Sequence, residues 1–284
     1  MSMLRGYLLV ALAAGSWGTW SLWFRAVERI GPFSAELEAL VVMATMAVVT
    51  LPFALREGRG RTRSRAAWGL IVAMGVSDAL NILLFFRAMR LGSLSVAVLS
   101  HSLAPVLVAA AAPFVIGEAT RVRTWLGALL SLSGLFVLLA PWRAGSTATF
   151  ACAAAGAGSA VFYAFNVLVQ KRIGASFSPA EVISYHSFPS AALLALAVPA
   201  GGYAVQGDQL AIVGVAALGP GALAGLAFVT ALRVVPASHA AVIALLEPLV
   251  AVLLAALVWG ETLGANGVVG GVAVLAGVWL TTRS

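Results

Sequence analysis

Apolar segments of about 20 residues recur from end to end of this 284-residue chain, and they limit what it can fold into. A helix of about 20 apolar residues is long enough to cross the roughly 30 Å hydrocarbon core of a bilayer. Only 10% of the residues are charged, against roughly 25% in soluble domains. Membrane β-barrels alternate apolar and polar residues along each strand, and this chain has no such alternation. The segments therefore predict an all-α polytopic membrane protein.

Ten such segments are separated by short turns that carry glycine, proline or arginine. We predict membrane-spanning helices at residues 6–24, 36–55, 67–86, 93–116, 124–141, 149–169, 179–199, 209–230, 236–258 and 264–282. With the N-terminus in the cytoplasm, cytoplasmic loops hold twelve Lys and Arg residues and outer loops hold five. Because cytoplasmic loops carry the excess of positive charge, both termini are predicted to be cytoplasmic.

The chain also repeats itself at a spacing of 143 residues, the separation of Glu38 from Glu181. Each repeat holds five predicted spans, an odd number, so the second repeat enters the membrane from the opposite side. We therefore predict inverted five-helix repeats at residues 1–141 and 142–284, with substrate bound where the halves meet. The aligned residues include Ala14-Gly15-Ser16 with Ala157-Gly158-Ser159, Phe85 with Phe228, Pro105 with Pro248, and Gly117-Glu118 with Gly260-Glu261.

Several stretches of the chain resemble a known family. They are Ala14-Gly15-Ser16-Trp17-Gly18 in the first span, residues 93–105 and Gly117-Glu118 in and after the fourth, and Leu246-Glu247-Pro248-Leu249 with Trp259-Gly260-Glu261 in and after the ninth. They resemble the ten-helix, EamA-type branch of the drug/metabolite transporter superfamily. The resemblance implies five-plus-five inverted repeats, alternating access around a central cavity, and transport of small metabolites, amino acids or drugs. The family often carries an Arg near the outer end of span two, where this chain has Glu36 and Glu38.

Two carboxylates lie deep in the predicted spans. Asp78 lies near the middle of span three, where a charge costs on the order of 3 kcal/mol on insertion. It either binds substrate or a proton, or forms a structural hydrogen bond to a neighbouring helix. Glu247 lies in span nine directly before Pro248, and either has the same chemical role or only accompanies the proline kink. We predict that Asp78 and Glu247 carry any coupling proton.

Other polar and aromatic residues lie at similar depth. A histidine can relay protons near neutral pH or can only hydrogen-bond across a helix contact, and an aromatic ring can stack on a substrate or face lipid. We expect Glu181 and His239 to face water, because they lie near predicted helix ends. The predicted substrate-binding residues are Trp17, Trp20, Asp78, Asn81, His101, Ser102, Tyr163, Asn166, His186 and Glu247.

The charges inside the spans indicate the class of substrate. The deep positions hold carboxylates and histidines but no Lys or Arg. An anion would require cationic partners, so a zwitterion or a cation suits these residues better. We predict a secondary transporter that exports an amino acid or related metabolite, with proton coupling as a hypothesis. A cationic drug or polyamine exporter is the alternative, and a membrane-embedded enzyme or a channel ranks lower.

The remaining expectations concern partners. We expect no enzyme activity, cofactor or metal, because neither H-E-x-x-H nor G-x-S-x-G occurs. The net charge of +7 does not indicate nucleic acid, since the Arg residues lie in short loops rather than on one face. The expected partners are a small-molecule substrate and the lipid of a bacterial cytoplasmic (inner) membrane. Glycines four residues apart, such as Gly267 and Gly271, allow close helix contacts, so span ten packs on span five within one molecule or forms a homodimer.

Overall fold

The computed structural model of the protein describes residues 1–60, 62–143, 150–260, 262 and 264–283, and every regular element in that part of the chain is helical. Glu261, which the repeat aligns with Glu118, lies outside the described residues. The elements in chain order are α1 (Met3–Gly18), α2 (Trp20–Glu28), α3 (Ala35–Glu57), α4 (Arg65–Leu91), α5 (Leu94–His101), α6 (Ala104–Val115), α7 (Val122–Leu139), η1 (Pro141–Arg143), α8 (Phe150–Ile173), α9 (Pro179–Ala197), α10 (Gly207–Ala216), η3 (Ala217–Leu223), α11 (Ala224–Leu232), α12 (Ala237–Ala244), α13 (Leu246–Trp259) and α14 (Ala265–Thr282).

Among the residues that the structure describes, eight helical segments are long and apolar enough to cross a membrane. Each of them overlaps one predicted span over most of its length, so the prediction of an α-helical, multi-pass membrane protein is confirmed. The other two predicted spans correspond to α1 with α2, which separate at Thr19, and to α9, whose sequence is more polar. Ten crossings therefore stay a prediction. The eight segments are Ala35–Glu57, Arg65–Leu91, Leu94–Val115, Val122–Arg143, Phe150–Ile173, Gly207–Leu232, Ala237–Trp259 and Ala265–Thr282.

Proline interrupts three of the predicted spans. The break between α5 and α6 precedes Pro105, and the break between α12 and α13 precedes Pro248. Each proline lacks the N–H that would continue the helix from the preceding turn. The two prolines are repeat mates, so the same break occurs in both halves. A third interruption, the π-helical segment η3 around Pro220, was not predicted from the sequence.

Equivalent helices of the two halves have equivalent neighbours. Helix α4 of the first half packs on α8 of the second half. Its equivalent in the second half, α11, packs on α1 of the first half. Likewise α5 and α6 contact α8, while α12 and α13 contact α1. Each half therefore supplies the helix against which the other half packs. The four clusters of buried apolar residues in the described ranges each contain residues of both halves.

The most extensive helix contact joins α7 to α14. A Cβ atom at Gly134 would lie 2.7 Å from the carbonyl oxygen of Gly270, and Gly127 is in similarly close contact with Gly277. Because the later residue of α7 faces the earlier residue of α14, the two helices run antiparallel. Small residues allow such close backbone contact inside a bilayer. This face of α14 is thus covered by α7 of the same molecule, as one of the two alternatives expects, and a homodimer through span ten stays a prediction.

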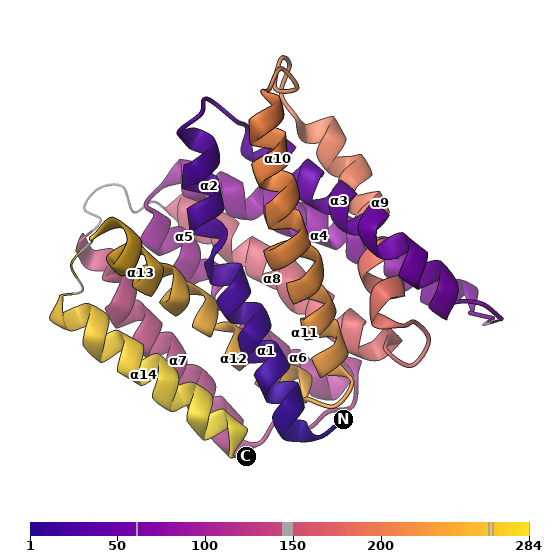
Figure 1. Cartoon of the computed structure of the whole chain (residues 1–284). Helices are drawn as coiled ribbons and strands as arrows, with labels where there is room; N and C mark the ends of the chain where they lie inside the picture. Colours follow the sequence, from indigo (N-terminus) through magenta and orange to yellow (C-terminus); the bar gives the residue numbers. More distant parts are fainter. Residues whose placement is uncertain (61, 144–149, 261, 263, 284) are drawn as a thin grey trace.

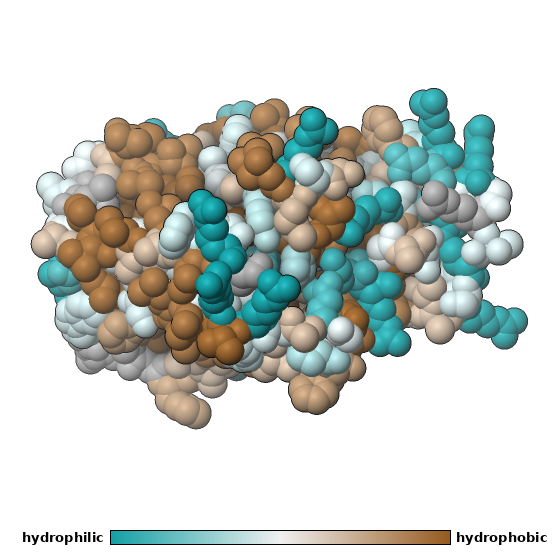
Figure 2. All heavy atoms as spheres, turned by 90° about the horizontal axis from the view of Figure 1, so that it is seen from below, coloured by the Kyte–Doolittle hydropathy of each residue, from teal (hydrophilic) through white to brown (hydrophobic). Residues whose placement is uncertain are grey.

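Both chain termini lie on one face of the bundle, at the bottom of Figure 1. We call it the terminal face, and we call the face with the turns at residues 29–34 and 198–206 the opposite face. Figure 2 views the terminal face, where hydrophilic side chains gather on one side and across the middle of an otherwise apolar surface. On the flanks of the bundle many large apolar side chains are exposed, including Leu8, Val72, Leu257 and Val269, as expected for helices surrounded by lipid.

Candidate functional site

Asp78 lies where α4, α8 and α9 meet. Its Oδ1 accepts a hydrogen bond of 3.1 Å from Nδ2 of Asn166 on α8. Its Oδ2 lies 3.7 Å from Nε2 of His186 on α9, and the two side chains are 17% and 5% exposed. A carboxylate in a membrane bundle is costly unless it is paired in this way. The arrangement therefore joins three helices around one carboxyl group.

The hydroxyl of Ser159 joins the polar residues on the adjacent side. It donates to the side-chain oxygen of Asn81 at 2.7 Å and to the Asn81 carbonyl oxygen at 3.0 Å. Nδ1 of His101, on α5, lies 2.9 Å from the same hydroxyl. Because the single hydroxyl proton is directed at Asn81, the lone pairs of Ser159 are available to an N–H of His101. One buried serine thus links α4, α5 and α8.

Aromatic rings enclose this group. The ring of His101 lies 4.8 Å from Phe85 and 5.4 Å from Tyr163, centroid to centroid. The buried hydroxyl of Tyr163 has no hydrogen-bond partner among the described residues, and the carboxyl groups of both Asp78 and Glu247 act on it electrostatically. Both carboxylates that the sequence singled out therefore lie within electrostatic range of Tyr163.

Glycines bring these helices close enough for the contacts to form. A side chain at Gly75, one turn before Asp78, would collide with the backbone carbonyl of His186 and the ring of Pro189. Gly156 has the same position between α8 and α5, where it lies against Ser100. Larger residues at these positions would push α9 and α5 away from the site, because membrane helix contacts depend on small residues.

Six of the ten predicted site residues come together in this way. Ser159 was missed as a site residue, although it lies four residues before Tyr163 and seven before Asn166. That spacing places the three side chains on one helical face, which is the signal that identifies it. We call the whole group the polar cluster, which consists of Asp78, Asn81, His101, Ser159, Tyr163, Asn166 and His186.

Glu247 lies near the polar cluster without joining it. Its carboxyl group forms no hydrogen bond or ion pair with the residues that the structure describes. Its backbone carbonyl oxygen would lie 2.8 Å from a Cβ atom at Gly18, so α13 packs closely on α1 at this point. Glu247 therefore combines an electrostatic effect on Tyr163 with a place at the kink between α12 and α13.

Three predicted site residues have other neighbours. Trp17 packs on Phe228 with ring centroids 5.2 Å apart, and Trp20 stacks on Phe24 at 5.6 Å. Ser102 donates its hydroxyl to the Val98 carbonyl of its own helix at 2.7 Å. Among the described residues, none of these hydrogen bonds or ring contacts reaches the polar cluster. Substrate binding by Trp17, Trp20 and Ser102 stays a prediction.

Two residues at helix ends contradict the expectation that they face water. Glu181 is fully buried and pairs with Arg63, and His239 is 6% exposed. The His239 ring bridges two helices, with the Tyr7 hydroxyl 2.8 Å from Nδ1 and the Thr124 hydroxyl 3.1 Å from Nε2. The expectation was wrong because it used position along the helix alone, whereas these helix ends pack against neighbouring loops and helices.

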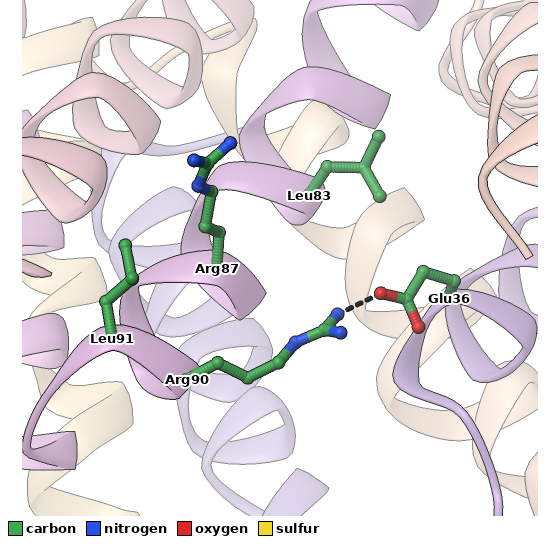
Figure 3. Close-up of a pocket in the computed structure, with 5 residues that line it drawn as sticks. All are labelled: Glu36, Leu83, Arg87, Arg90 and Leu91. Carbon is green, nitrogen blue, oxygen red and sulfur yellow. Dashed lines mark hydrogen bonds and ion pairs between the residues drawn. The ribbon is translucent and has the colours of Figure 1, made fainter. Parts of the chain in front are cut away.

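A pocket of about 280 Å³ opens between α3 and α4 on the opposite face. It is lined by Glu36, Leu83, Arg87, Arg90 and Leu91. Figure 3 shows Arg90 extending from α4 to pair with Glu36 at the start of α3.

Within the described ranges, no group of three or more His, Cys, Asp or Glu side chains is arranged to hold a metal ion. The functional groups of the polar cluster are therefore one carboxylate, two imidazoles, two amides and two hydroxyls.

Known proteins share this sequence pattern and fold. An uncharacterized transporter from Archaeoglobus fulgidus is 28% identical over 279 residues, which cover 98% of this chain and 96% of that protein. A protein of known crystal structure, 20% identical in sequence, has the same fold with a TM-score of 0.83 over 99% of this chain and 98% of that chain. The EamA-like transporter family matches residues 4–140 and again residues 150–283. Since these two matches cover nearly all of the sequence, the chain belongs to the EamA-like transporter family.

Proposed function

We propose that this transporter moves a small zwitterionic or cationic organic solute, in the first place an amino acid or a related metabolite, out across a bacterial cytoplasmic membrane. The observation that carries the proposal is the position of Asp78, a carboxylate at the junction of three helices. Its contacts within the described part of the chain include an amide and an imidazole but no Lys or Arg. Such a group attracts an ammonium ion and repels an anion.

Two buried polar atoms in the polar cluster support this assignment. Oδ1 of Asn166 and the hydroxyl of Tyr163 have no hydrogen-bond partner among the described residues. The amide oxygen accepts hydrogen bonds and so suits the ammonium group that Asp78 attracts, while the phenol can donate to a carboxylate. Because buried polar groups are normally paired, we propose that the solute supplies both missing partners.

We further propose that the chain crosses the membrane ten times, as two inverted repeats at residues 1–141 and 142–284 with cytoplasmic termini. The antiparallel contact of the repeat-equivalent helices α7 and α14 supports this arrangement. Inverted repeats allow alternating access, because an exchange of conformation between the halves converts an outward-open state into an inward-open one.

Proton antiport is the proposed source of energy. The ammonium group of a solute and a proton neutralise the same carboxylate, so both cannot be bound to Asp78 at once. Glu247, which forms no ion pair with the described residues, is the second proposed proton carrier. This exclusive occupancy would couple the inward movement of a proton to the outward movement of solute.

Counterflow in proteoliposomes tests the transporter and its substrate class together. We expect saturable exchange of radiolabelled amino acids, and little or no exchange of anionic metabolites such as nucleotide sugars. Ohmic single-channel currents in planar bilayers would contradict a carrier. Exchange of anions alone would contradict the proposed role of Asp78 while leaving the transporter assignment intact.

Export of a cationic drug or polyamine is the second candidate. It is favoured by the two carboxylates, Asp78 and Glu247, that act on Tyr163 from different helices, because a dication could bind both. The Glu247→Gln variant separates the candidates. It should weaken polyamine exchange much more than amino acid exchange if a dication is the substrate, and should affect both equally otherwise.

A further inference from the structure

Helix α8 carries polar residues along one face, from the polar cluster toward the terminal face. They are spaced four, three and four residues apart, which places their side chains on the same side of the helix. These residues are Ser159, Tyr163, Asn166 and Gln170. Gln170 lies about 6 Å beyond Asn166 along the helix axis, so the polar face of α8 extends past the polar cluster by one residue.

Most of the side chains on this face contain a buried polar atom without a partner. The described residues hold five such atoms, and three of them are the Tyr163 hydroxyl, Oδ1 of Asn166 and Oε1 of Gln170. Buried polar atoms are normally paired with protein or with ordered water. A run of unpaired atoms along one helix face therefore indicates that a ligand or water binds there.

Gln170 also lines a pocket of about 330 Å³ on the terminal face, where α8 and α11 end (Figure 1). Lys171 and Ala175 line it from the end of α8 and the turn that follows, and Leu232 and Arg233 line it from the end of α11. Small-molecule sites have volumes from roughly 300 Å³ upward. The polar face of α8 thus runs from the polar cluster to a pocket large enough for a small solute.

Arg233 is a cation of this pocket that no described carboxylate neutralises. The ammonium group of Lys171 lies 3.0 Å from Glu118 and donates to two backbone carbonyl oxygens, so its charge and its protons have partners. Arg233 donates to the Phe177 carbonyl at 2.8 Å and forms no ion pair with the described residues. A guanidinium group has five N–H donors, so Arg233 can also bind a carboxylate with its remaining donors.

The repeat explains why Arg233 lacks a carboxylate partner. Its mate Arg90 pairs with Glu36 at the pocket of the opposite face (Figure 3). The mate of Glu36 in the second half is Pro179, which has no charge. An arginine therefore lines a pocket in both halves, but only Arg90 has a glutamate of its own at the equivalent position.

We infer that the terminal-face pocket is a second solute site, which binds a zwitterion of the amino acid type with its carboxylate on Arg233 and its ammonium group on Oε1 of Gln170. The inference rests on the proposed transport of such a solute, and it adds a site that the polar face of α8 joins to the polar cluster. Arg233 repels a dication, and an anion without N–H donors leaves the Gln170 oxygen unpaired. The pocket therefore selects the amino acid over the polyamine.

Protection of an introduced thiol tests this site. Cys152 is the only cysteine, so Cys152→Ser provides a background without thiols, and Ala175→Cys adds an exposed thiol that lines the pocket. The purified protein in detergent is labelled with a maleimide in the presence of each standard amino acid, or of the amine or carboxylic acid that lacks one of its charges. At ten times its Kd, a bound amino acid should slow labelling about tenfold, and neither singly charged analogue should do so at that concentration.

Variants of the pocket separate it from the polar cluster. Arg233→Gln removes the guanidinium group and Gln170→Leu removes the acceptor, and each should raise the Kd measured by protection about tenfold or more. Arg172→Gln is the matched control, because Arg172 also donates to a backbone carbonyl, that of Val115 at 2.9 Å, but does not line the pocket. It should leave protection unchanged. Asp78→Asn should retain protection even where counterflow is lost.

Two results with free amino acids would overturn the second site. One is an unchanged labelling rate of Ala175→Cys with every amino acid, and the other is full protection in folded Arg233→Gln and Gln170→Leu variants. If Arg233→Gln does not fold, Gln170→Leu decides alone. Counterflow on the same preparations keeps the two proposals distinct. Exchange without protection would indicate the proposed transporter without this site, whereas protection without exchange would contradict the proposed transport and leave the site.

A lipid headgroup is the competing occupant, because phosphatidylethanolamine also combines an ammonium group with an anion. Labelling of Ala175→Cys is therefore compared in liposomes of phosphatidylethanolamine and of phosphatidylcholine, whose headgroup has no N–H donor. Free amino acids should protect the thiol equally in both. Slower labelling in phosphatidylethanolamine, together with no protection by any amino acid, would assign the pocket to lipid and overturn the solute site.

Discussion

The α7–α14 contact and the polar cluster use the duplicated sequence in opposite ways. In the helix pair, equivalent residues face one another, and the hydroxyl of Ser131 donates at 3.2 Å to the carbonyl of Val274, its own repeat mate. In the polar cluster the mates differ, since Asp78 corresponds to Gly221 and His101 to Ala244. Symmetry is thus kept where backbones pack and is lost where polar chemistry is concentrated.

This difference has a physical reason. Close packing of two antiparallel helices needs only small side chains, and the same residues serve on both sides of the contact. A buried carboxylate costs free energy unless it has partners, so a second copy of Asp78 would need a second set of partners. One solute requires one such site, and the second half instead contributes Ser159, Tyr163, Asn166 and His186 around it.

The largest expected effect is the loss of transport when the carboxylate of the polar cluster is replaced. Asp78→Asn keeps the shape of the side chain and a hydrogen-bonding oxygen, but it cannot release a proton. Transport driven by a pH gradient should fall to the level of empty liposomes, while the protein still inserts and elutes as a folded species. Asp208→Asn, the same substitution at an exposed aspartate near the start of α10, is the control and should retain transport. Unchanged pH-driven transport by Asp78→Asn would rule out its coupling role.

The stability of the α7–α14 contact should depend on the size of its side chains rather than on their charge. In Gly134→Val the new side chain would meet the backbone of Gly270, and we expect a loss of about 3 kcal/mol in stability from overpacking. Thermal unfolding in detergent, monitored by gel filtration, measures this loss of stability. Gly69→Ala is the control, because a Cβ atom there meets no atom within 4 Å. Equal stability of the two variants would contradict the close contact of α7 and α14.

A pair of equivalent serines sharpens the comparison directly. Ser159→Ala removes the hydroxyl shared by Asn81 and His101, and we expect about a tenfold loss of apparent solute affinity, or about 1.4 kcal/mol. Ser16→Ala changes its repeat mate, whose side chain forms no hydrogen bond with the described residues, and should leave affinity within about twofold. Concentration dependence of counterflow measures both. Similar losses in the two variants would mean that both halves bind solute alike.

The smallest effect is expected at the end of α7. Ala140 ends the helix in the left-handed region at φ 43°, where a Cβ atom is unfavourable, so Ala140→Gly should stabilise the protein by about 1 kcal/mol. Gly260 ends α13 in the same conformation at φ 69°, and Gly260→Ala should destabilise it by a similar amount. Thermal unfolding of the two variants in parallel checks the sign, and stabilisation by both would refute the argument.

The sequence predicted the helices well because hydrophobicity reports on the length of each apolar segment. The predicted span at residues 179–199, for example, corresponds to α9 at Pro179–Ala197. The interruptions were harder to predict. Pro105 and Pro248 gave a signal, but the separation at Thr19 and the π-helical turn around Pro220 depend on how each backbone packs against its neighbours.

The candidate site could be predicted only in part for a related reason. The depth of Asp78 and Asn166 in their spans marked each residue, but hydrophobicity does not say which helices are neighbours. Ser159 was missed because a serine in a run of small residues is not unusual in a spanning helix. Glu181 was wrongly expected to face water because its partner Arg63 lies 118 positions earlier in the chain.

The contact between Asp78 and Asn166 also has a consequence for biogenesis. The two residues are 88 positions apart, so α4 emerges from the ribosome long before α8 and α9. During that interval Asp78 is in the translocon or the bilayer without its partners, and α4 is retained against a penalty on the order of 3 kcal/mol. The second half then completes the coordination of a residue that the first half has already inserted, so either half synthesised alone should be a substrate for membrane quality control.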